Sequence, residues 1–311
     1  MKKKSYGKKL LAWVLALAVS MTLVPVVGQR EVQAAKIMNA WDGETTEVPK
    51  TDENGTYQIS NGAELAWFAK KVNDGASSIN GELTDKIYLG DGTSQNKWLM
   101  IGDTAEHAYK GTFNGNGYTV YFLDAEISEE NPDVRYAGLF GVVDGGTISN
   151  VKVSGEVHNN YAAYKTEGKY EKLYIGSGGI AGYLKSGTIS GCTNYTETTM
   201  AGEALRRNAG GIVGICSGTV RRCVNNGTIS TKVRFAQHNI GGIAGMEVGP
   251  NAVIRYCENK EAVQGYYSVG GIAGGVYQGA AVQNCYNKAK ISGVDTIGGI
   301  AGGVNESSVY A

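Results

Sequence analysis

Glycine and one apolar residue recur along the second half of the chain in a short box. Each box reads small or apolar residue, Gly-Gly or Ala-Gly, Leu or Ile, any residue, and Gly. The glycines before the Leu or Ile lie 41, 32, 31, 29 and 28 residues apart, at Gly138, Gly179, Gly211, Gly242, Gly271 and Gly299. A period in this range is typical of proteins built from stacked repeats. The pattern therefore predicts an architecture and leaves the ligand open.

A cysteine followed two positions later by an asparagine recurs about half a period after four of the boxes. These pairs are Cys192 and Asn194, Cys223 and Asn225, Cys257 and Asn259, and Cys285 and Asn287. A third short β-prone piece closes each repeat. Glycine occupies 46 of 311 positions, which excludes repeats made of helical hairpins. The sequence predicts an all-β parallel β-solenoid, in which each coil lays its strands on the next.

Each repeated residue type has an expected structural role. Glycine at a coil corner permits either a positive φ or a very close approach to the neighbouring coil. The Leu or Ile of each box is expected to point inward and stack on its counterparts. The cysteines are expected to form a column of small buried apolar groups, and the asparagines a ladder of side-chain amides. These structural interpretations are favoured over any catalytic one.

One segment near residues 61–73 changes to a helical period. Its apolar positions are Leu65, Phe68, Ala69 and Val72. Asn61 is expected to be the N-cap, with Glu64 as its capping-box partner. A solenoid must cover its terminal apolar face and unpaired strand edge, so this helix is predicted to cap the N-terminal end. The sixth box is followed by only a short segment up to Ala311, so further repeats or an attachment domain are expected beyond it.

These features resemble the GLUG-motif repeat proteins of bacterial cell surfaces. The lead-in to the repeats also follows that family's order: TYQISNGAELAWFAKKVN from Thr56, LTDKIYL from Leu83, WLMIG from Trp98 and YKGTFNGNGYTVYFL from Tyr109. The resemblance covers nearly all of the chain after about residue 40. It implies a right-handed parallel β-helix of the pectate-lyase-like kind, in an exported protein, and often as one segment of a longer surface protein.

The N-terminus predicts export. Lysines at positions 2–4, 8 and 9 form a basic head, residues 10–24 are apolar, and Val32-Gln33-Ala34 offers a small-residue cleavage pattern. We interpret residues 1–34 as a signal peptide, residues 35–135 as the cap and first coils, and residues 136–311 as the repeats. An uncleaved anchor is disfavoured because the apolar stretch is short and Pro25 ends it. The expected location is secreted or cell-surface, with no membrane span after cleavage.

Composition and motifs argue against several classes of function. The 29 basic and 29 acidic residues balance, so bulk attraction to nucleic acid is not expected. None of the three histidines begins an H-E-x-x-H helix, and cysteines about 30 residues apart without a histidine are not a zinc motif. After Pro132, acidic residues are too few and scattered for a carboxylate pair. We predict no catalytic, metal or cofactor site, and stacked cysteines rather than disulfides, with Cys216 outside the column.

Two features are candidates for binding. The long first interval predicts an insertion over residues 158–174 that presents Tyr161, Tyr164, Tyr170 and Tyr174. A basic strip within residues 205–260 includes Arg206, Arg207, Arg221 and Arg222. Tyrosines and a basic strip would suit a glycan, a cell-wall polymer or a host surface protein. The alternatives are tyrosines packed on the solenoid flank and a merely solvated charged face.

The sequence thus predicts a secreted or surface-exposed structural or adhesion module that presents loops from a β-solenoid, and not an enzyme. The alternative is a non-catalytic repeat segment of a larger exported peptidase or carbohydrate-active enzyme.

Overall fold

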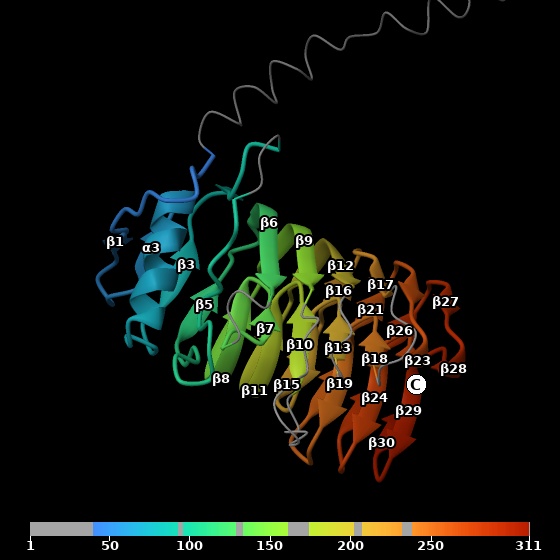
Figure 1. Cartoon of the computed structure of the whole chain (residues 1–311). Helices are drawn as coiled ribbons and strands as arrows, with labels where there is room; N and C mark the ends of the chain where they lie inside the picture. The colour runs from blue at the N-terminus through green and yellow to red at the C-terminus, as the bar shows by residue number, and fades with distance from the viewer. Residues whose placement is uncertain are drawn as a thin grey trace, which may run out of the picture. The chain divides into compact units, whose positions relative to one another are not determined.

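The computed structural model describes residues 40–92, 96–128, 133–160, 174–201, 207–231 and 238–310. Within them the chain forms a stack of parallel β-coils with one helix, α3 (Gly62–Asn73), near its N-terminal end (Figure 1). The predicted parallel β-solenoid with an N-terminal helix is confirmed. The predicted signal peptide, residues 1–34, lies outside the described residues.

Three sheets run along the stack. Sheet A has 14 strands: β1 (Lys50–Thr51), β2 (Tyr57–Ile59), β3 (Gly81–Leu83), β5 (Thr112–Asn114), β8 (Phe140–Ser149), β11 (Ala181–Ser190), β14 (Val213–Cys216), β15 (Thr219–Arg221), β19 (Ala244–Val248), β20 (Val253–Arg255), β24 (Ala273–Tyr277), β25 (Ala281–Gln283), β29 (Ala301–Asn305) and β30 (Ser308–Tyr310). Its strands pair in parallel, except that β1 and β2 are antiparallel.

Sheet B has ten strands: β4 (Ile87–Tyr88), β6 (Thr119–Ile127), β9 (Lys152–Asn159), β12 (Thr193–Met200), β16 (Val224–Asn225), β17 (Ile229–Thr231), β21 (Glu258–Asn259), β22 (Val263–Gln264), β26 (Tyr286–Asn287) and β27 (Ile291–Ser292). Sheet C has six strands: β7 (Tyr136–Ala137), β10 (Ile175–Gly178), β13 (Arg207–Gly210), β18 (His238–Gly241), β23 (Tyr267–Gly270) and β28 (Asp295–Gly298). Sheet C therefore begins where the glycine boxes begin.

The register between coils follows the sequence period. In sheet C the successive partners are Gly178, Gly210, Gly241, Gly270 and Gly298. The apolar residue of each box points inward, as predicted, and five of the six are fully buried: Leu139, Ile180, Ile212, Ile243 and Ile272. This column forms part of one core that runs through the stack.

Helix α3 covers the first coils with its apolar face. Leu65, Phe68, Ala69 and Val72 are all buried, as the helical period predicts. The Phe68 ring packs edge-on against Phe113 of sheet A, with 5.8 Å between ring centroids.

The N-cap of the helix is also confirmed, with one change in its partner. The Asn61 side chain accepts a hydrogen bond from the Glu64 N–H at 2.9 Å. The Glu64 carboxylate accepts from the Ser60 N–H at 2.6 Å rather than from Asn61.

A ladder of asparagine side chains runs through four coils, as predicted; its first three members are buried and Asn287 is half-buried. The Asn194 amide donates to Asn225 at 2.8 Å, Asn225 donates to Asn259 at 2.8 Å, and Asn259 donates to Asn287 at 2.9 Å. Asn225 also bonds both backbone groups of Gly227, two residues on. Because buried amides need partners, this arrangement explains an asparagine at one fixed position in each coil.

The box glycines make the space for this ladder. A Cβ on Gly179, Gly211, Gly242 or Gly271 would lie 2.0 to 2.4 Å from the asparagine of its own repeat. A Cβ on Gly138 would lie 2.3 Å from the Gly178 carbonyl oxygen. Of the two roles expected for these glycines, close approach to a neighbouring group is therefore the one observed. None of the six box glycines has a positive φ. The glycine of each box and the asparagine of the same repeat are thus the two sides of one close contact.

One left-handed corner shared by five coils lies elsewhere, one residue before the cysteine position. It is occupied by Asn150, Gly191, Arg222, Tyr256 and Asn284, with φ of 53°, 64°, 53°, 56° and 51°. Asparagine and glycine adopt this conformation readily, whereas other residues pay for it in backbone strain.

Tyr256→Asn is expected to raise the free energy of unfolding by about 1 kcal/mol, because it removes strain at the corner without changing the fold. Tyr256 is exposed, so little packing is lost. The measurement is urea unfolding, with Tyr286→Asn as the control, since Tyr286 is exposed and has no positive φ. An equal response of the two variants would contradict the corner assignment.

The cysteines form the predicted column. The Cys223 N–H lies 3.5 Å from the Cys257 sulfur, and the Cys257 N–H lies 3.4 Å from the Cys285 sulfur. All five cysteines are free and buried. Cys216 lies apart from the column, in β14, and burial raises the pKa of its thiol well above the ordinary value. Buried thiols kept protonated are structural rather than reactive groups.

Candidate functional site

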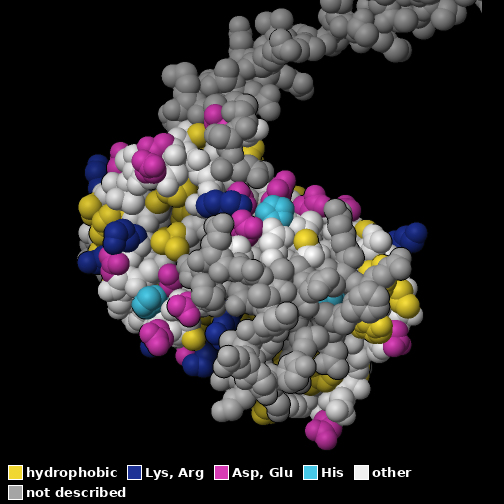
Figure 2. Space-filling view, in the orientation of Figure 1, with side chains coloured by type: hydrophobic (Ala, Val, Ile, Leu, Met, Phe, Trp, Pro, Cys, Tyr) yellow, Lys and Arg dark blue, Asp and Glu magenta, His cyan; other side chains and the backbone are white. Residues whose placement is uncertain are grey.

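Charged and polar side chains form one cluster on sheet B and beside it. The cluster, called the polar cluster below, comprises Lys97, Asp124, Glu126, Glu156, His158, Asn160 and Thr199. Strands β6, β9 and β12 supply most of its members. Figure 2 shows acidic, basic and histidine side chains gathered on the face in view.

The parallel register brings these residues together. Asp124 of β6 is the partner of Glu156 of β9, and Glu126 is the partner of His158. His158 is in turn the partner of Thr199 in β12. Residues one repeat apart in the sequence are therefore neighbours across the sheet, and alternate residues of one strand share its face.

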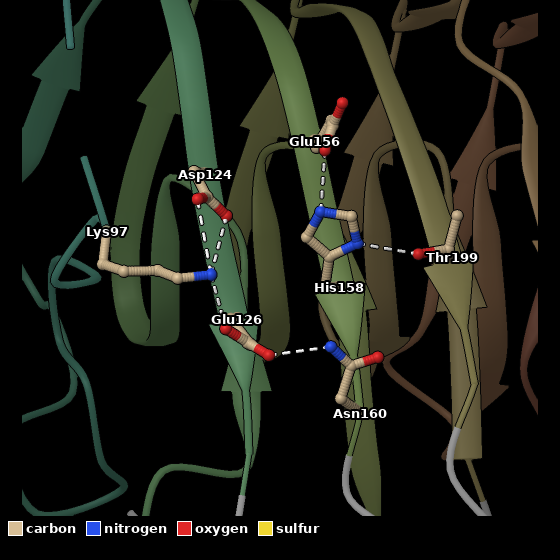
Figure 3. Close-up of polar contacts among 7 residues, drawn as sticks. All are labelled: Lys97, Asp124, Glu126, Glu156, His158, Asn160 and Thr199. Atoms are coloured by element: carbon tan, nitrogen blue, oxygen red, sulfur yellow. Dashed lines mark hydrogen bonds and ion pairs between the residues drawn. The ribbon is translucent and has the colours of Figure 1, made fainter. Parts of the chain in front are cut away.

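One half of the polar cluster is a network of ion pairs and hydrogen bonds (Figure 3). Lys97 Nζ lies 2.5 Å from Glu126 Oε2 and 3.4 Å from Asp124. The Asn160 amide donates to Glu126 Oε1 at 2.7 Å. Burial raises the pKa of Glu126, but the hydrogen bonds from Lys97 and Asn160 outweigh it and hold that pKa below its ordinary value. Burial lowers the pKa of Lys97, yet Glu126 and Asp124 raise it overall. Both groups are therefore charged at neutral pH.

The other half holds His158 between a carboxylate and a hydroxyl. Its Nε2 lies 2.8 Å from Glu156 Oε2, and its Nδ1 lies 2.8 Å from Thr199 Oγ1. A carboxylate, a histidine and a hydroxyl bonded in this order also form the catalytic triad of hydrolases, in which the histidine activates the hydroxyl as a nucleophile. Here, however, β12 is paired with β9 on one side and with β16 and β17 on the other. Strand N–H groups used in ladders cannot form an oxyanion site.

Metal binding gains no support from the described residues, which contain no group of three or more His, Cys, Asp or Glu side chains placed to hold an ion.

The tyrosine candidates are only partly described. Tyr174 lies directly before β10 and is 39% exposed. Tyr161, Tyr164 and Tyr170 lie outside the described residues. The first two residues of the predicted insertion, His158 and Asn159, belong to strand β9.

The prediction of an exposed basic strip is wrong for Arg207. This residue opens β13, where all four residues are buried, and its register partners are Ile175 and His238. Sheet C packs closely against sheet A at this point. A Cβ added to Gly245 of β19 would lie only 2.4 Å from the Ala209 nitrogen of β13.

The other arginines of the strip differ in position. Arg221 is half-buried and Arg222 is exposed at the left-handed corner. The register places Arg221 beside the exposed Arg255. Arg206 lies outside the described residues.

Sequence reasoning missed the polar cluster, because the acidic residues look scattered along the chain. The signal was their spacing: 32 residues separate Asp124 from Glu156 and Glu126 from His158. That interval matches the period of the boxes, so these positions were bound to stack.

The fold and repeats define a β-solenoid with a GLUG motif, which the family model described as "The GLUG motif" matches at residues 265–292. The chain is also similar to a crystal structure from Bacteroides ovatus of a protein described as a "putative immunoglobulin A1 protease". The TM-score is 0.54 and the identity 19%, over 85% of this chain and 76% of that chain. This likeness shows the fold alone. Comparison with curated proteins gives no match. The predicted GLUG motif and solenoid are confirmed.

Proposed function

We propose that this chain is a secreted or surface-exposed structural and adhesion module. The polar cluster carries the proposal: its side chains are held in place by their own contacts, on strands whose other residues, such as Ala125 and Val157, are buried in the core. A polar surface ordered before binding loses less entropy when a partner docks. The basic head and apolar stretch within residues 1–34 support export.

The alternative is a non-catalytic repeat segment of a larger exported peptidase or carbohydrate-active enzyme. The fold likeness to the Bacteroides ovatus protein favours a peptidase as that larger protein. No helix in the described part of the chain is long and apolar enough to cross a membrane.

The proposal is tested on intact producing cells. Antibodies against the chain should label the unbroken cell surface, and the combined variant Glu126→Gln/Glu156→Gln should lower adhesion about tenfold, the cost of losing a charged hydrogen bond. The control is Asp144→Asn, whose carboxylate pairs with Lys185 at 2.7 Å away from the polar cluster. Label found only inside cells, or adhesion unchanged in the double variant at equal surface amount, would refute the proposal.

A further inference from the structure

A groove of about 440 Å³ lies where strands β18, β23 and β28 of sheet C meet the ends of β19 and β24 of sheet A. Three tyrosines line it, Tyr174, Tyr267 and Tyr277, together with the side chains of Asn239 and Gln278. This volume is within the range of small-ligand sites.

The Tyr277 ring is fixed in the groove by two features. It lies over Gly275, where a Cβ would be 2.3 Å from the ring, so the glycine makes its space. Its hydroxyl donates to the Asn239 oxygen at 2.9 Å, and the Asn239 amide donates to Asn208 at 2.8 Å. A ring held in this way loses little freedom on binding a ligand.

Backbone strain gathers in the same groove. Ser268, Gln278 and Thr296 all line it, and their φ angles are 44°, 57° and 56°. Left-handed conformations are costly for such residues, above all for a β-branched threonine, and they concentrate at binding sites. Ser268 and Thr296 occupy the same place in successive coils, so these left-handed positions recur with the repeat and set the shape of the groove.

The groove suits an uncharged ligand rich in hydroxyl groups. The described residues that line it include no Asp, Glu, Lys or Arg. Its histidine, His238, is buried, and burial together with the charge of Arg207 lowers its pKa to about 4, so it is neutral at pH 7. Tyrosine faces stack on the apolar face of a sugar ring, and amides bond its hydroxyls.

An extended peptide fits less well. Strands β18 and β23 are each paired on both sides within sheet C. A peptide therefore cannot add to these two strands as a further strand, which is the mode that supplies backbone hydrogen bonds to extended ligands. Of the three sheet C strands at the groove, only β28 has an unpaired edge in the described part of the chain.

We propose that this groove binds a neutral oligosaccharide, with Tyr174, Tyr267 and Tyr277 against the sugar rings and Asn239 and Gln278 bonding the hydroxyls. The inference deepens the proposed function, on which it rests for access to glycans outside the cell.

The test is calorimetric titration of the purified chain with a panel of neutral oligosaccharides of glucose, mannose, galactose and N-acetylglucosamine. At least one member should bind with a Kd of about 1 mM or tighter. Tyr267→Ala should weaken that binding at least about tenfold, as loss of an aromatic anchor does. A second variant, Gln278→Gly, removes an amide while relieving backbone strain, and it should weaken binding without lowering the melting temperature.

The matched control is Tyr286→Ala, because Tyr286 is 67% exposed on sheet B and lies outside the groove. It should bind like the unaltered chain. No binding by any member of the panel, binding equal in Tyr267→Ala, or binding of an extended peptide in place of the sugars would overturn the inference. These results do not depend on where the cell puts the protein, so they are separate from the surface-labelling test of the proposed function.

Discussion

Glu247→Leu is expected to stabilise the folded chain by about 3 kcal/mol at pH 7, a large effect for one substitution. Glu247 lies in β19, is 0% exposed, and makes no hydrogen bond through either carboxyl oxygen. Burial raises its pKa to about 9, and the nearby N–H groups of Ile254 and Ala281 oppose this only weakly. Its register partners, Cys216 and Val276, are buried and uncharged at neutral pH, so a leucine matches this column.

The same carboxyl makes the protein less stable as the pH rises. The unfolded chain releases this proton near the ordinary pKa of 4.5, whereas the folded chain holds it until about pH 9. Between these values the folded state binds one more proton, so the free energy of unfolding falls by about 1.4 kcal/mol per pH unit. Its contribution is complete below pH 4.5 and declines up to pH 9.

His238 acts in the opposite direction at lower pH. Its pKa is lowered from 6.5 to about 4 in the folded chain, so stability is lost as the pH falls through that window. The two effects oppose each other between pH 4.5 and 6.5. The range from about 6.5 to 8 isolates Glu247, because above it the buried thiols, whose pKa values burial raises, also make the stability fall as the pH rises.

The measurement is urea unfolding of the unaltered chain, Glu247→Gln and Glu247→Leu across that range. Glu247→Gln keeps the side-chain shape and removes the titration, so its stability should vary less with pH. Parallel pH profiles for the unaltered chain and Glu247→Gln would show that the buried carboxyl is not the cause.

Gly242→Ala should destabilise the fold by about 3 kcal/mol, whereas Gly299→Ala should be nearly neutral. A Cβ on Gly242 would lie 2.2 Å from the Gly271 carbonyl oxygen and 2.3 Å from Asn259 Cγ. Asn259 belongs to the amide ladder and bonds both Asn225 and Asn287, so it cannot move away without breaking a hydrogen bond. At Gly299 nothing lies within 4 Å of the added carbon, because the 311 residues stop before the asparagine position of that repeat.

These two glycines occupy the same place in the motif, so they form a matched pair. Thermal unfolding of the two variants measures the close approach and cancels the general effect of replacing glycine with alanine on the unfolded chain. Equal losses in both variants would mean that conformational freedom, rather than the space for the asparagine ladder, explains the conserved spacing of the box.

The sequence allows the fold to be predicted because its repeats leave few arrangements open. Three β-prone pieces per period require stacked coils, and one asparagine per period requires partners in the next coil, so the ladder from Asn194 follows. The positions with positive φ were not predictable from glycine alone, since the corner tolerates Arg222 and Tyr256.

The candidate sites were harder to predict, because they depend on which face each residue occupies. In the sequence Arg207 looks like a surface charge. Its strand is buried, because sheets A and C approach closely there at Gly245. The groove combines residues from four coils, and no local motif marks it. Only Tyr174 of the residues singled out beforehand lines it.

The asparagine ladder also gives the interior of the solenoid an electrical direction. In every rung the amide NH₂ points toward the coil that follows in the chain, from Asn194 through Asn225 and Asn259 to Asn287. Strand dipoles largely cancel within a sheet, whereas these side-chain dipoles add head to tail and polarise one another. The row therefore ends in a carbonyl oxygen at Asn194 and in a donor at Asn287. Negative charge is favoured near Asn287 and disfavoured near Asn194, as at the two ends of a helix.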